Sequence, residues 1–589
     1  MSIVFVDPAD NALVVQGAYD QKTIIADLGG CWDATNKVWR IVFTINNLEA
    51  LLDAIPDIQV DVNLAQHVQN QMEKEAKLEK LRVMSKQDMQ VCLRIPGLKG
   101  SLYNYQRLGV MYAVENRTGL LLADSMGLGK SVQAIGTALF MKAEGAKKVL
   151  VVTPASLKYN WPLEIEKFTD EKYVIIDGTP DERIAQWMQD DVFFYIVNYE
   201  LVVEDLFGGK NFRLLEEQED ETDEQKAKRE RKERTMVKAK QRQRLLSEIR
   251  NRNWDLIVID EGHALKHHSS ARSRAIKSLR GRFKMALTGT PMDGRLEELH
   301  SLMQFVAPGL LCSKTRFFQK HVETDFWGRV TGYKKVGEVT QKIQPFFLRR
   351  LKQDVLKDLP DKVYENRIIT LTPEEMRIYK QLAENGHKAT EDASAMVAII
   401  RCKQFCNYPS MVDSNCKSNS KMEAFKEVVD EVVVQNGNKI LVFTQYKTML
   451  DIIDSELLNM GIKFLRIDGD TPKQSRADMQ ERFNKDKTID AMIGTDAMST
   501  GLNFQAANTV LHFDSFWSPS VMDQRTDRCH RIGQKSVVTS FSFICKDTIE
   551  ERIQGILYSK AKISAQALGD DTDDMVLKRL GPKEIAKLL

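Results

Sequence analysis

One segment constrains the fold of this chain more than any other: the run Asp124–Ser131, which reads Asp-Ser-Met-Gly-Leu-Gly-Lys-Ser. An apolar stretch, Leu120–Ala123, precedes it, and a helix-forming stretch follows it from Val132. A glycine-rich loop between a buried strand and a helix presents backbone N–H groups at a helix N-terminus, where phosphate binds. The segment therefore predicts a parallel α/β sheet with this loop at the carboxyl end of one strand.

A second apolar stretch, Leu256–Ile259, ends on the acidic pair Asp260-Glu261. In sites that transfer phosphoryl groups, one such carboxylate holds Mg²⁺ and the other orients or deprotonates the attacking water. We therefore predict that Asp260 and the Ser131 hydroxyl bind Mg²⁺, and that Glu261 activates water. Lys130 is predicted to reach the β- and γ-phosphates of ATP as a point charge.

The remaining nucleotide-binding residues are predicted from the loop and from a helix before it. Gly127 and Gly129 allow backbone N–H groups to approach phosphates without a side chain in the way. Asp124 stands where the usual motif has its first glycine. Gln106 precedes the loop, and its amide offers the paired donor and acceptor that would read the adenine edge. An exposed helix residue is the alternative interpretation of Gln106.

The composition excludes several classes of protein. Of 589 residues 43% are hydrophobic, and 84 Lys and Arg against 82 Asp and Glu give a net charge of +2. This length predicts about three to five domains, and the balanced charge means that any DNA site must be a local patch. There is no apolar run of membrane-spanning length and no signal peptide pattern. With eight cysteines and no dense spacing, a soluble intracellular protein is expected, cytoplasmic in a prokaryote or virus and nuclear in a eukaryote.

Two long stretches of alternating strand and helix patterns predict two doubly wound α/β lobes. The predicted strands of the first are 119–123, 148–153, 173–176, 192–197, 254–259 and 285–290, and those of the second are 439–444, 463–467, 491–495, 509–513 and 537–543. Residues 316–357 are interpreted as a basic helical bridge. No repeat occurs at a solenoid period, so the pattern indicates two similar lobes and not an array.

Residues 208–252 interrupt the first lobe with a charged insertion. Residues 216–224 are strongly acidic, and residues 226–244 are mostly Lys, Arg and Gln. A solvated helical or partly disordered insertion is the favoured interpretation. A basic arm along a nucleic-acid backbone is the alternative.

Cys402, Cys406 and Cys416 form the one cysteine cluster to be weighed as a metal site. Their spacing lacks a fourth ligand at a distance typical of zinc. Buried structural cysteines are therefore expected, and no metal besides Mg²⁺.

Polar residues at predicted strand ends are candidate contacts to DNA phosphates, because these ends share an edge with the phosphate loop. They are Thr153, Trp161, Asn198, Thr288, Thr290 and, in the second lobe, Thr495.

The segment Gln524–Gln534 opens a predicted helix with arginines at a spacing of three residues, which share one face. An arginine from a second domain can stabilise the charge on a transferred phosphoryl group, worth roughly 10³–10⁵ in rate. Arg528 and Arg531 are therefore predicted to be catalytic, and Gln524 to bind nucleotide. Surface arginines paired with acidic neighbours are the alternative.

These strings, in this order, resemble the Swi/Snf-type ATPases of helicase superfamily two over roughly residues 100–560. The loop resembles D-E-M-G-L-G-K-T, with Ser125 for Glu and Ser131 for Thr, and Asp260–His263 resembles D-E-A-H, with Gly262 for Ala. Further matching strings are Leu287–Pro291, Phe347–Arg350, Cys402–Pro409, Asp468–Arg476, Arg528–Gln534 and Thr548–Ile553. The resemblance implies two RecA-like lobes, DNA-dependent ATP hydrolysis with Mg²⁺, and movement along duplex DNA without strand separation.

The N-terminal string Trp32–Arg40 resembles the HARP module found beside this motor in annealing helicases. That resemblance implies recognition of branched or junction DNA, with Trp32, Lys37 and Trp39 as candidate DNA contacts. A small packing domain with two core tryptophans is the alternative.

The expected fold is therefore α/β, with two lobes of doubly wound parallel sheet, a small α+β N-terminal module and a charged helical insertion. The predicted division is 1–60 module, 61–99 helical connector, 100–310 first lobe, 311–420 helical bridge, 421–560 second lobe and 561–589 helical tail. The predicted function is ATP-dependent translocation on branched or forked duplex DNA, in strand annealing or fork regression, by a monomer that meets replication or repair proteins. The alternatives are a remodeller that displaces proteins from DNA and a non-hydrolysing nucleotide-gated DNA clamp.

Overall fold

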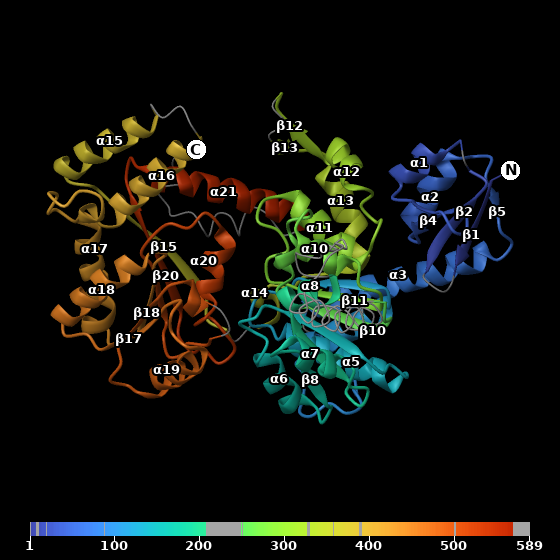
Figure 1. Ribbon diagram of the computed structural model, residues 1–589, viewed down its shortest axis with the longest axis horizontal. Helices are drawn as coiled ribbons and strands as arrows, with labels where there is room; N and C mark the ends of the chain where they lie inside the picture. Colours follow the sequence, from blue (N-terminus) through green and yellow to red (C-terminus); the bar gives the residue numbers. More distant parts are fainter. Residues whose placement is uncertain are drawn as a thin grey trace, which may run out of the picture. The chain divides into compact units, whose positions relative to one another are not determined.

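The structure is a computed structural model that describes residues 2–7, 11–18, 20–87, 89–207, 249, 251–326, 330–356, 359–387, 392–499 and 502–568. It consists of two compact units (Figure 1). Unit 1 comprises Met1–Met292 and Leu296–Val355, and unit 2 comprises Asp293–Arg295 and Leu356–Leu589. Most of the predicted charged insertion, and most of the predicted C-terminal tail, lie outside the described residues. Within the described residues, no helix is long and apolar enough to cross a membrane.

Unit 1 is built on a seven-stranded sheet with the strand order β14-β6-β11-β10-β7-β9-β8. Its strands are β6 (Gly119–Leu122), β7 (Val149–Thr153), β8 (Tyr173–Ile175), β9 (Phe194–Asn198), β10 (Trp254–Ile259), β11 (Gly281–Leu287) and β14 (Phe347–Leu348). Neighbouring strands are parallel. Strands such as β6 and β7 are buried along their whole length, which suits continuous apolar runs covered by helices on both faces.

Helices pack around this sheet and complete the core of unit 1. They are α4 (Asn104–Asn116), α5 (Lys130–Ala143), α6 (Asn160–Phe168), α7 (Pro180–Trp187), α8 (Tyr199–Phe207), α10 (Ala271–Lys277), α11 (Leu296–Val306), α12 (Lys314–His321), α13 (Val336–Ile343) and α14 (Lys352–Val355). A short antiparallel hairpin, β12 (Val322–Thr324) and β13 (Val330–Tyr333), follows α12. The predicted doubly wound lobe is thereby confirmed.

The N-terminal residues form a separate small sheet within unit 1, in the order β3-β4-β2-β1-β5. Its elements are β1 (Ile3–Asp7), β2 (Ala12–Gln16), α1 (Lys22–Asp27), β3 (Cys31–Asp33), β4 (Val38–Val42), α2 (Ile45–Ala54) and β5 (Gln59–Val60). The connecting helix α3 (Leu64–Lys86) buries Leu64 in the core of this module and Leu78 and Leu81 in the core of the large sheet. The helix therefore belongs to both cores.

Unit 2 contains a six-stranded parallel sheet with the strand order β15-β20-β19-β16-β18-β17. Its strands are β15 (Lys362–Ile369), β16 (Ile440–Phe443), β17 (Phe464–Ile467), β18 (Ala491–Gly494), β19 (Thr509–His512) and β20 (Val538–Cys545). Its helices are α15 (Pro373–His387), α16 (Asp392–Asn407), α17 (Ser420–Val429), α18 (Lys447–Asn459), α19 (Lys473–Lys485), α20 (Pro519–Thr526) and α21 (Ile549–Leu568). The second predicted lobe is likewise confirmed.

The structure divides the predicted helical bridge, residues 311–420, between the two units. Its first part contains β14, which pairs with β6 at one edge of the unit 1 sheet, and ends with α14. Its next part forms β15, an eight-residue strand that pairs with β20 along its whole length. Both strands pair with segments distant in sequence, so the local basic pattern does not reveal them.

Candidate functional site

The loop after β6 has the backbone conformation that binding of phosphate requires. Gly127 and Gly129 lie at φ values of 83° and 70°, in the left-handed region that disfavours side chains. A Cβ atom on Gly129 would also lie 2.4 Å from Nε2 of Gln106. Helix α5 begins at Lys130, whose Nζ donates to the carbonyl of Asp124 at 2.9 Å. The predicted loop therefore directs its lysine back across its own backbone.

Gln106 is buried beside this loop. Its Nε2 donates to the Leu128 carbonyl at 3.2 Å, and its Oε1 accepts from the backbone N–H of Tyr103 at 3.1 Å. It thus ties the first turn of α4 to the loop. Ser131 follows Lys130 in the first turn of α5 and is partly buried. Adenine reading by Gln106 stays a prediction.

Asp260 stands at the end of β10, and three neighbouring elements hold it. Its Oδ2 accepts from the indole N–H of Trp161 in α6 at 2.9 Å and lies 3.5 Å from the hydroxyl of Thr153 at the end of β7. The hydroxyl of Tyr199, the first residue of α8, donates to the Asp260 carbonyl at 2.7 Å. The Oδ1 atom of Asp260 accepts a hydrogen bond from the backbone N–H of Glu261 at 2.9 Å. The carboxylate predicted to hold Mg²⁺ is therefore held in place from several sides.

Burial and the adjacent Glu261 carboxylate raise the pKa of Asp260 to about 6, against the opposing effects of the Trp161 hydrogen bond and Lys130. Two neighbouring carboxylates with little solvent repel each other and gain from a cation. Mg²⁺ fits this donor set, because carboxylate and hydroxyl oxygens are its usual protein ligands. Asp260 and Ser131 would hold it, as the sequence predicts.

Glu261 has a left-handed backbone, with φ 49° and ψ 55°. Such a conformation is rare for residues other than glycine because it is strained. It persists only where the surrounding structure holds it, often at functional sites. It turns the chain from β10 into a short 3₁₀ helix, Gly262–Leu265. His263 Nδ1 lies 3.1 Å from Glu261 Oε2. A Cβ on Gly262 would meet Leu302 at 3.4 Å, an ordinary contact, so the alanine of the usual string would also fit.

The structure places four of the predicted DNA contacts of unit 1 in buried positions. Thr153 and Thr288 are fully buried, and Trp161 and Asn198 are 3% and 7% exposed. Thr153 and Trp161 contact Asp260, and the Thr288 hydroxyl accepts from the N–H of Thr290 at 3.1 Å. These four residues therefore expose little or no surface in this structure, and their contact with DNA stays a prediction. Thr290 is partly exposed and keeps its predicted role.

Arg350 is absent from the predicted site, yet it lies against the phosphate loop. It is fully buried and forms an ion pair with the equally buried Asp124. The Asp124 carboxylate is thus occupied by protein donors, and only its carbonyl is turned toward Lys130. A charged residue in place of the first glycine was the available signal, because an acidic side chain beside a buried strand requires a counter-ion.

In unit 2, Arg528 and Arg531 both reach the segment that follows residue 501. Arg528 donates to the carbonyls of Gln524 and Leu502 at 3.2 and 3.3 Å. Arg531 donates to the Asp527 carbonyl at 3.1 Å and also to the Asn503 side chain. The structure therefore brings the two predicted arginines together on one segment. Their role at ATP stays a prediction.

The helix predicted to open at Gln524 is wrong beyond its first residues, because α20 ends at Thr526 and Arg528 and Arg531 lie in the turns that follow it. A third arginine, Arg525, lies on α20 itself. It is fully buried, 2.8 Å from Asp496, with its guanidinium over the rings of Phe443 and Phe516. The predicted DNA contact Thr495 precedes Asp496 and is partly exposed.

The N-terminal module presents its tryptophans as a cross-strand pair. Trp32 on β3 faces Trp39 on β4, with ring centroids 5.3 Å apart. Trp32 is 39% exposed, whereas Trp39 is partly buried. Lys37 lies exposed in the connecting turn, whose start is held by Asp33 accepting from the backbone N–H of Thr35 at 3.0 Å. The module thus has an aromatic surface beside a lysine.

The cysteines predicted to be structural lie in a hydrophobic core. Cys406 is near Cys545 and Glu550, with their possible ligand atoms within 4.8 Å of one another. However, Lys421 Nζ lies 2.7 Å from Glu550 Oε1, and the Cys545 N–H donates to Oε2 at 3.0 Å. The buried ammonium already neutralises the carboxylate, which argues against a metal. The three cysteines of the sequence cluster are all buried: Cys402, Cys406 and Cys416.

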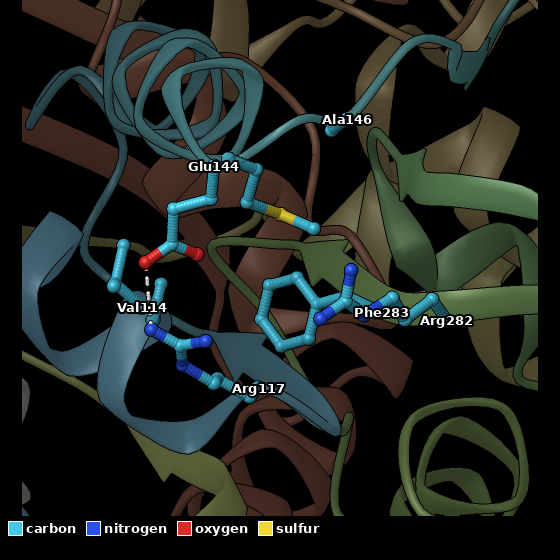
Figure 2. Close-up of a pocket in the computed structure, with 8 residues that line it drawn as sticks. Val114, Arg117, Glu144, Ala146, Arg282 and Phe283 are labelled. Atoms are coloured by element: carbon cyan, nitrogen blue, oxygen red, sulfur yellow. Dashed lines mark hydrogen bonds and ion pairs between the residues drawn. The ribbon is translucent and has the colours of Figure 1, made fainter. Parts of the chain in front are cut away.

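The pocket in Figure 2 lies at the other end of the unit 1 sheet, between the last turns of α4 and α5 and the start of β11. Arg117 and Glu144 form an ion pair of 2.7 Å across it. None of its lining residues belongs to the phosphate loop or to the carboxylate pair. It is therefore not the nucleotide site.

Comparison with known proteins shows which family this chain resembles. The SNF2-related domain matches residues 103–416, and the helicase conserved C-terminal domain matches residues 420–533. An uncharacterized ATP-dependent helicase of Mycoplasma pneumoniae is 31% identical over 485 residues, which is 80% of this chain and 43% of the relative. The putative ATP-dependent helicase/translocase YwqA of Bacillus subtilis is 30% identical over 502 residues, or 80% of this chain and 49% of the relative. The chain spans less than half the length of these relatives.

A solved structure, the Sulfolobus solfataricus SWI2/SNF2 ATPase core in complex with dsDNA, is 26% identical, with coverage of 85% of this chain and 99% of that one and a TM-score of 0.39. The SNF2-related domain alone matches more than half of the 589 residues. It contains the phosphate loop and the carboxylate pair in one unit. The chain therefore belongs to the SNF2-related family, and its match to the helicase conserved C-terminal domain lies in unit 2.

Proposed function

We propose that this chain hydrolyses ATP to move along double-stranded DNA without separating its strands, and that it acts on branched or forked DNA in annealing or fork regression. The observation that carries hydrolysis is the Asp260-Glu261 pair, held at the end of β10 in the sheet that carries the phosphate loop. A clamp that only binds nucleotide would not need a water-activating carboxylate.

The residues of unit 1 suit hydrolysis with distinct roles. Mg²⁺-ATP supplies the reactive γ-phosphoryl group and the metal charge that neutralises its oxygens. Lys130 and the loop N–H groups bind and orient the phosphates, and Asp260 and Ser131 hold the metal. Glu261 accepts a proton from water, and His263, 3.1 Å from Glu261, orients that carboxylate.

Arg528 and Arg531 complete the proposed chemistry. Carbonyl and amide oxygens hold their guanidinium groups on one segment of unit 2. An arginine presented from a second domain can stabilise the charge that develops on the transferred phosphoryl group. We propose that they act there when DNA is bound.

The N-terminal module supports the proposed preference for branched DNA. An exposed tryptophan offers a face on which an unpaired base can stack, and stacking is worth about 1–3 kcal/mol per base. Trp32, with Lys37 in the adjoining turn, provides this combination of ring and charge. Branch points are where unpaired bases occur, so the module would bind the branch and the motor the duplex.

The proposal is tested by ATP hydrolysis rates with duplex, single-stranded and forked DNA at equal nucleotide concentration. Duplex DNA is expected to stimulate hydrolysis, and forked DNA to do so at lower concentration. Stimulation by single strands alone would exclude a duplex translocase, and equal half-saturation by duplex and fork would exclude branch preference. An assay for rewinding of a melted duplex distinguishes annealing from protein displacement, because displacement of proteins from DNA requires no rewinding.

A further inference from the structure

The buried ion pair between Asp124 and Arg350 joins the phosphate loop to the last strand of unit 1. The Arg350 Nε donates to Asp124 Oδ1 at 2.9 Å, its backbone N–H donates to the same oxygen at 3.1 Å, and Nη2 contacts Oδ2. Both side chains have no exposed surface. Such a two-pronged pair fixes orientation as well as charge.

Residues of helices α4 and α5 accommodate the guanidinium group of Arg350. Its Nη2 donates to Gln133 Oε1 of α5 at 2.6 Å, while Gln133 Nε2 donates to Asp124 Oδ2 at 3.1 Å. On α4, a Cβ added to Gly109 would lie 2.0 Å from Gln133 Oε1 and 2.9 Å from Arg350 Nη2. The absence of a side chain at Gly109 therefore makes room for the cluster.

Backbone contacts fasten the same two segments together. The N–H of Ala123 donates to the Leu348 carbonyl at 2.8 Å, and the N–H of Ser125 donates to the Arg350 carbonyl at 3.0 Å. The Asp124 carbonyl in turn accepts from Lys130 Nζ at 2.9 Å. Arg350 thus holds the loop residue whose carbonyl positions the phosphate-binding lysine.

Arg350, which pairs with Asp124, lies close to the point where the chain leaves unit 1. Unit 1 ends at Val355, and the chain continues into unit 2 from Leu356. Arg350 lies in the last segment of unit 1, shortly before that exit. We propose that Arg350 is a positioning residue for ATP binding and hydrolysis, which makes the segment leading to unit 2 part of the support of the phosphate loop. This inference rests on the proposed function.

A purely structural ion pair is the competing explanation, and unit 1 contains a matched example. Arg183 on α7 and Asp205 on α8 form a 2.7 Å pair with side chains 5% and 1% exposed, and neither contacts the loop. Loss of one partner leaves the other charge buried without compensation, so disturbing either pair is expected to lower the stability of unit 1. Of these two arginines, only Arg350 is expected to influence the binding and hydrolysis of ATP.

The test compares Arg350→Lys with Arg183→Lys, because each keeps one charge and loses the two-pronged geometry. Thermal unfolding, affinity for a non-hydrolysable ATP analogue with Mg²⁺, and duplex-stimulated kcat are measured below the unfolding transition. Arg350→Lys is expected to lower kcat at least about 10-fold and to weaken analogue binding about 5-fold, as small misplacements in a phosphate site do. Arg183→Lys is expected to leave both within twofold while losing similar stability.

Unchanged kcat and analogue affinity in Arg350→Lys, or equal losses in Arg183→Lys, would overturn the inference. If Arg350→Lys does not fold, Asp124→Asn keeps the side-chain volume, removes the charge and is expected to show the same losses. A wild-type protein that hydrolyses no ATP with any DNA would instead refute the proposed function. The analogue affinities of the variants would still decide the role of Arg350.

Discussion

The carboxyl edges of the two parallel sheets have the same topology but opposite chemistry. At the edge of the unit 1 sheet, the Asp260-Glu261 pair is crowded enough to raise the pKa of Asp260 to about 6. At the edge of the unit 2 sheet, the buried carboxylate Asp514 accepts from the Thr444 hydroxyl at 2.7 Å and from the Gln445 N–H and side-chain amide at 2.8 and 3.0 Å. The first edge gains from a cation, whereas the second is satisfied by its own donors.

This difference shows that a parallel sheet does not by itself make a nucleotide site. The strand ends bring polar groups together in both units, but at the unit 1 edge the adjacent carboxylate of Glu261 helps to raise the pKa of Asp260. Unit 2 uses its polar groups to hold arginines, as Asp496 holds Arg525. We therefore expect substitutions at the unit 1 edge to change chemistry and those at the unit 2 edge to change stability or the response to DNA.

The largest effect is expected for Glu261→Gln, which keeps shape but removes the carboxylate that accepts a proton. Duplex-stimulated turnover should fall on the order of 10² to 10⁴-fold, the usual contribution of a general base. ATP binding should persist. The matched change at the other edge is Asp514→Asn, for which a lower unfolding temperature and a much smaller loss of turnover are expected. Near-normal turnover in Glu261→Gln would remove the assignment of the water-activating residue.

The next largest effect is expected for Arg531→Ala in unit 2. Turnover in the presence of DNA should fall roughly 10- to 100-fold, less than for a sole catalytic arginine, because Arg528 shares the role. DNA affinity, measured by fluorescence anisotropy, should change less than about twofold. Lost DNA binding with preserved hydrolysis would show instead that the segment after α20 contacts the DNA backbone.

Trp161→Phe tests whether the hydrogen bond from Trp161 supports Asp260 as a metal ligand. The substitution removes this hydrogen bond and keeps an aromatic ring. The Mg²⁺ concentration for half-maximal hydrolysis should rise about 10-fold, as with other partners of metal ligands. Trp187→Phe is the matched control, because Trp187 donates to the buried Asp205 at 3.2 Å away from the nucleotide site. Equal Mg²⁺ dependence in both variants would leave Trp161 a packing residue.

Trp32→Ala tests the N-terminal module apart from both sheets. Duplex-stimulated hydrolysis should stay within about twofold, while affinity for forked DNA should fall about 5- to 10-fold, in line with one stacked base. Leu163→Ala removes a similarly exposed apolar side chain, 65% exposed on α6, and should leave fork affinity unchanged. If fork affinity survives Trp32→Ala, the module is a packing domain.

The smallest effect is expected from buried histidines such as His300 in unit 1 and His512 in unit 2. Burial lowers the pKa of His300 to about 4 and the pKa of His512 well below its usual value. Since an unfolded His takes up a proton near pH 6.5, stability is full above that pH and is lost as pH falls toward 4. From pH 7 to 5.5, His300 should cost unit 1 about 1 kcal/mol. Chemical denaturation of His300→Asn at pH 7 and at pH 5.5 should show a smaller loss of stability between the two pH values than the wild-type protein shows.

Much of the nucleotide site follows from local sequence. A loop with two glycines and a lysine needs only a strand before it and a helix after it, and an acidic pair after an apolar run needs only that run to be a strand. The two sheets were predictable for the same reason, because fully buried parallel strands have continuous apolar sequences. Such features depend on neighbouring residues, and the structure confirms the strands and helices.

The errors arose where partners are distant in sequence. The edge strands β14 and β15 have mixed sequences, and each is defined by pairing with a strand on another part of the chain. The sequence alone did not indicate that the indole N–H of Trp161 donates to Asp260, which lies 99 residues away. Arg350 lies 226 residues from Asp124. No local pattern distinguishes an exposed side chain from a buried one that holds another.

The chain's own order of residues was thus enough to determine the phosphate loop, the carboxylate pair and the two α/β lobes, because hydrophobic burial and glycine conformations act over a few residues. Which polar side chains face solvent, and which support the loop and the metal-binding carboxylate, was decided only in three dimensions. Burial of a charge is tolerated only beside its counter-charge, and folding brings these partners together across hundreds of residues.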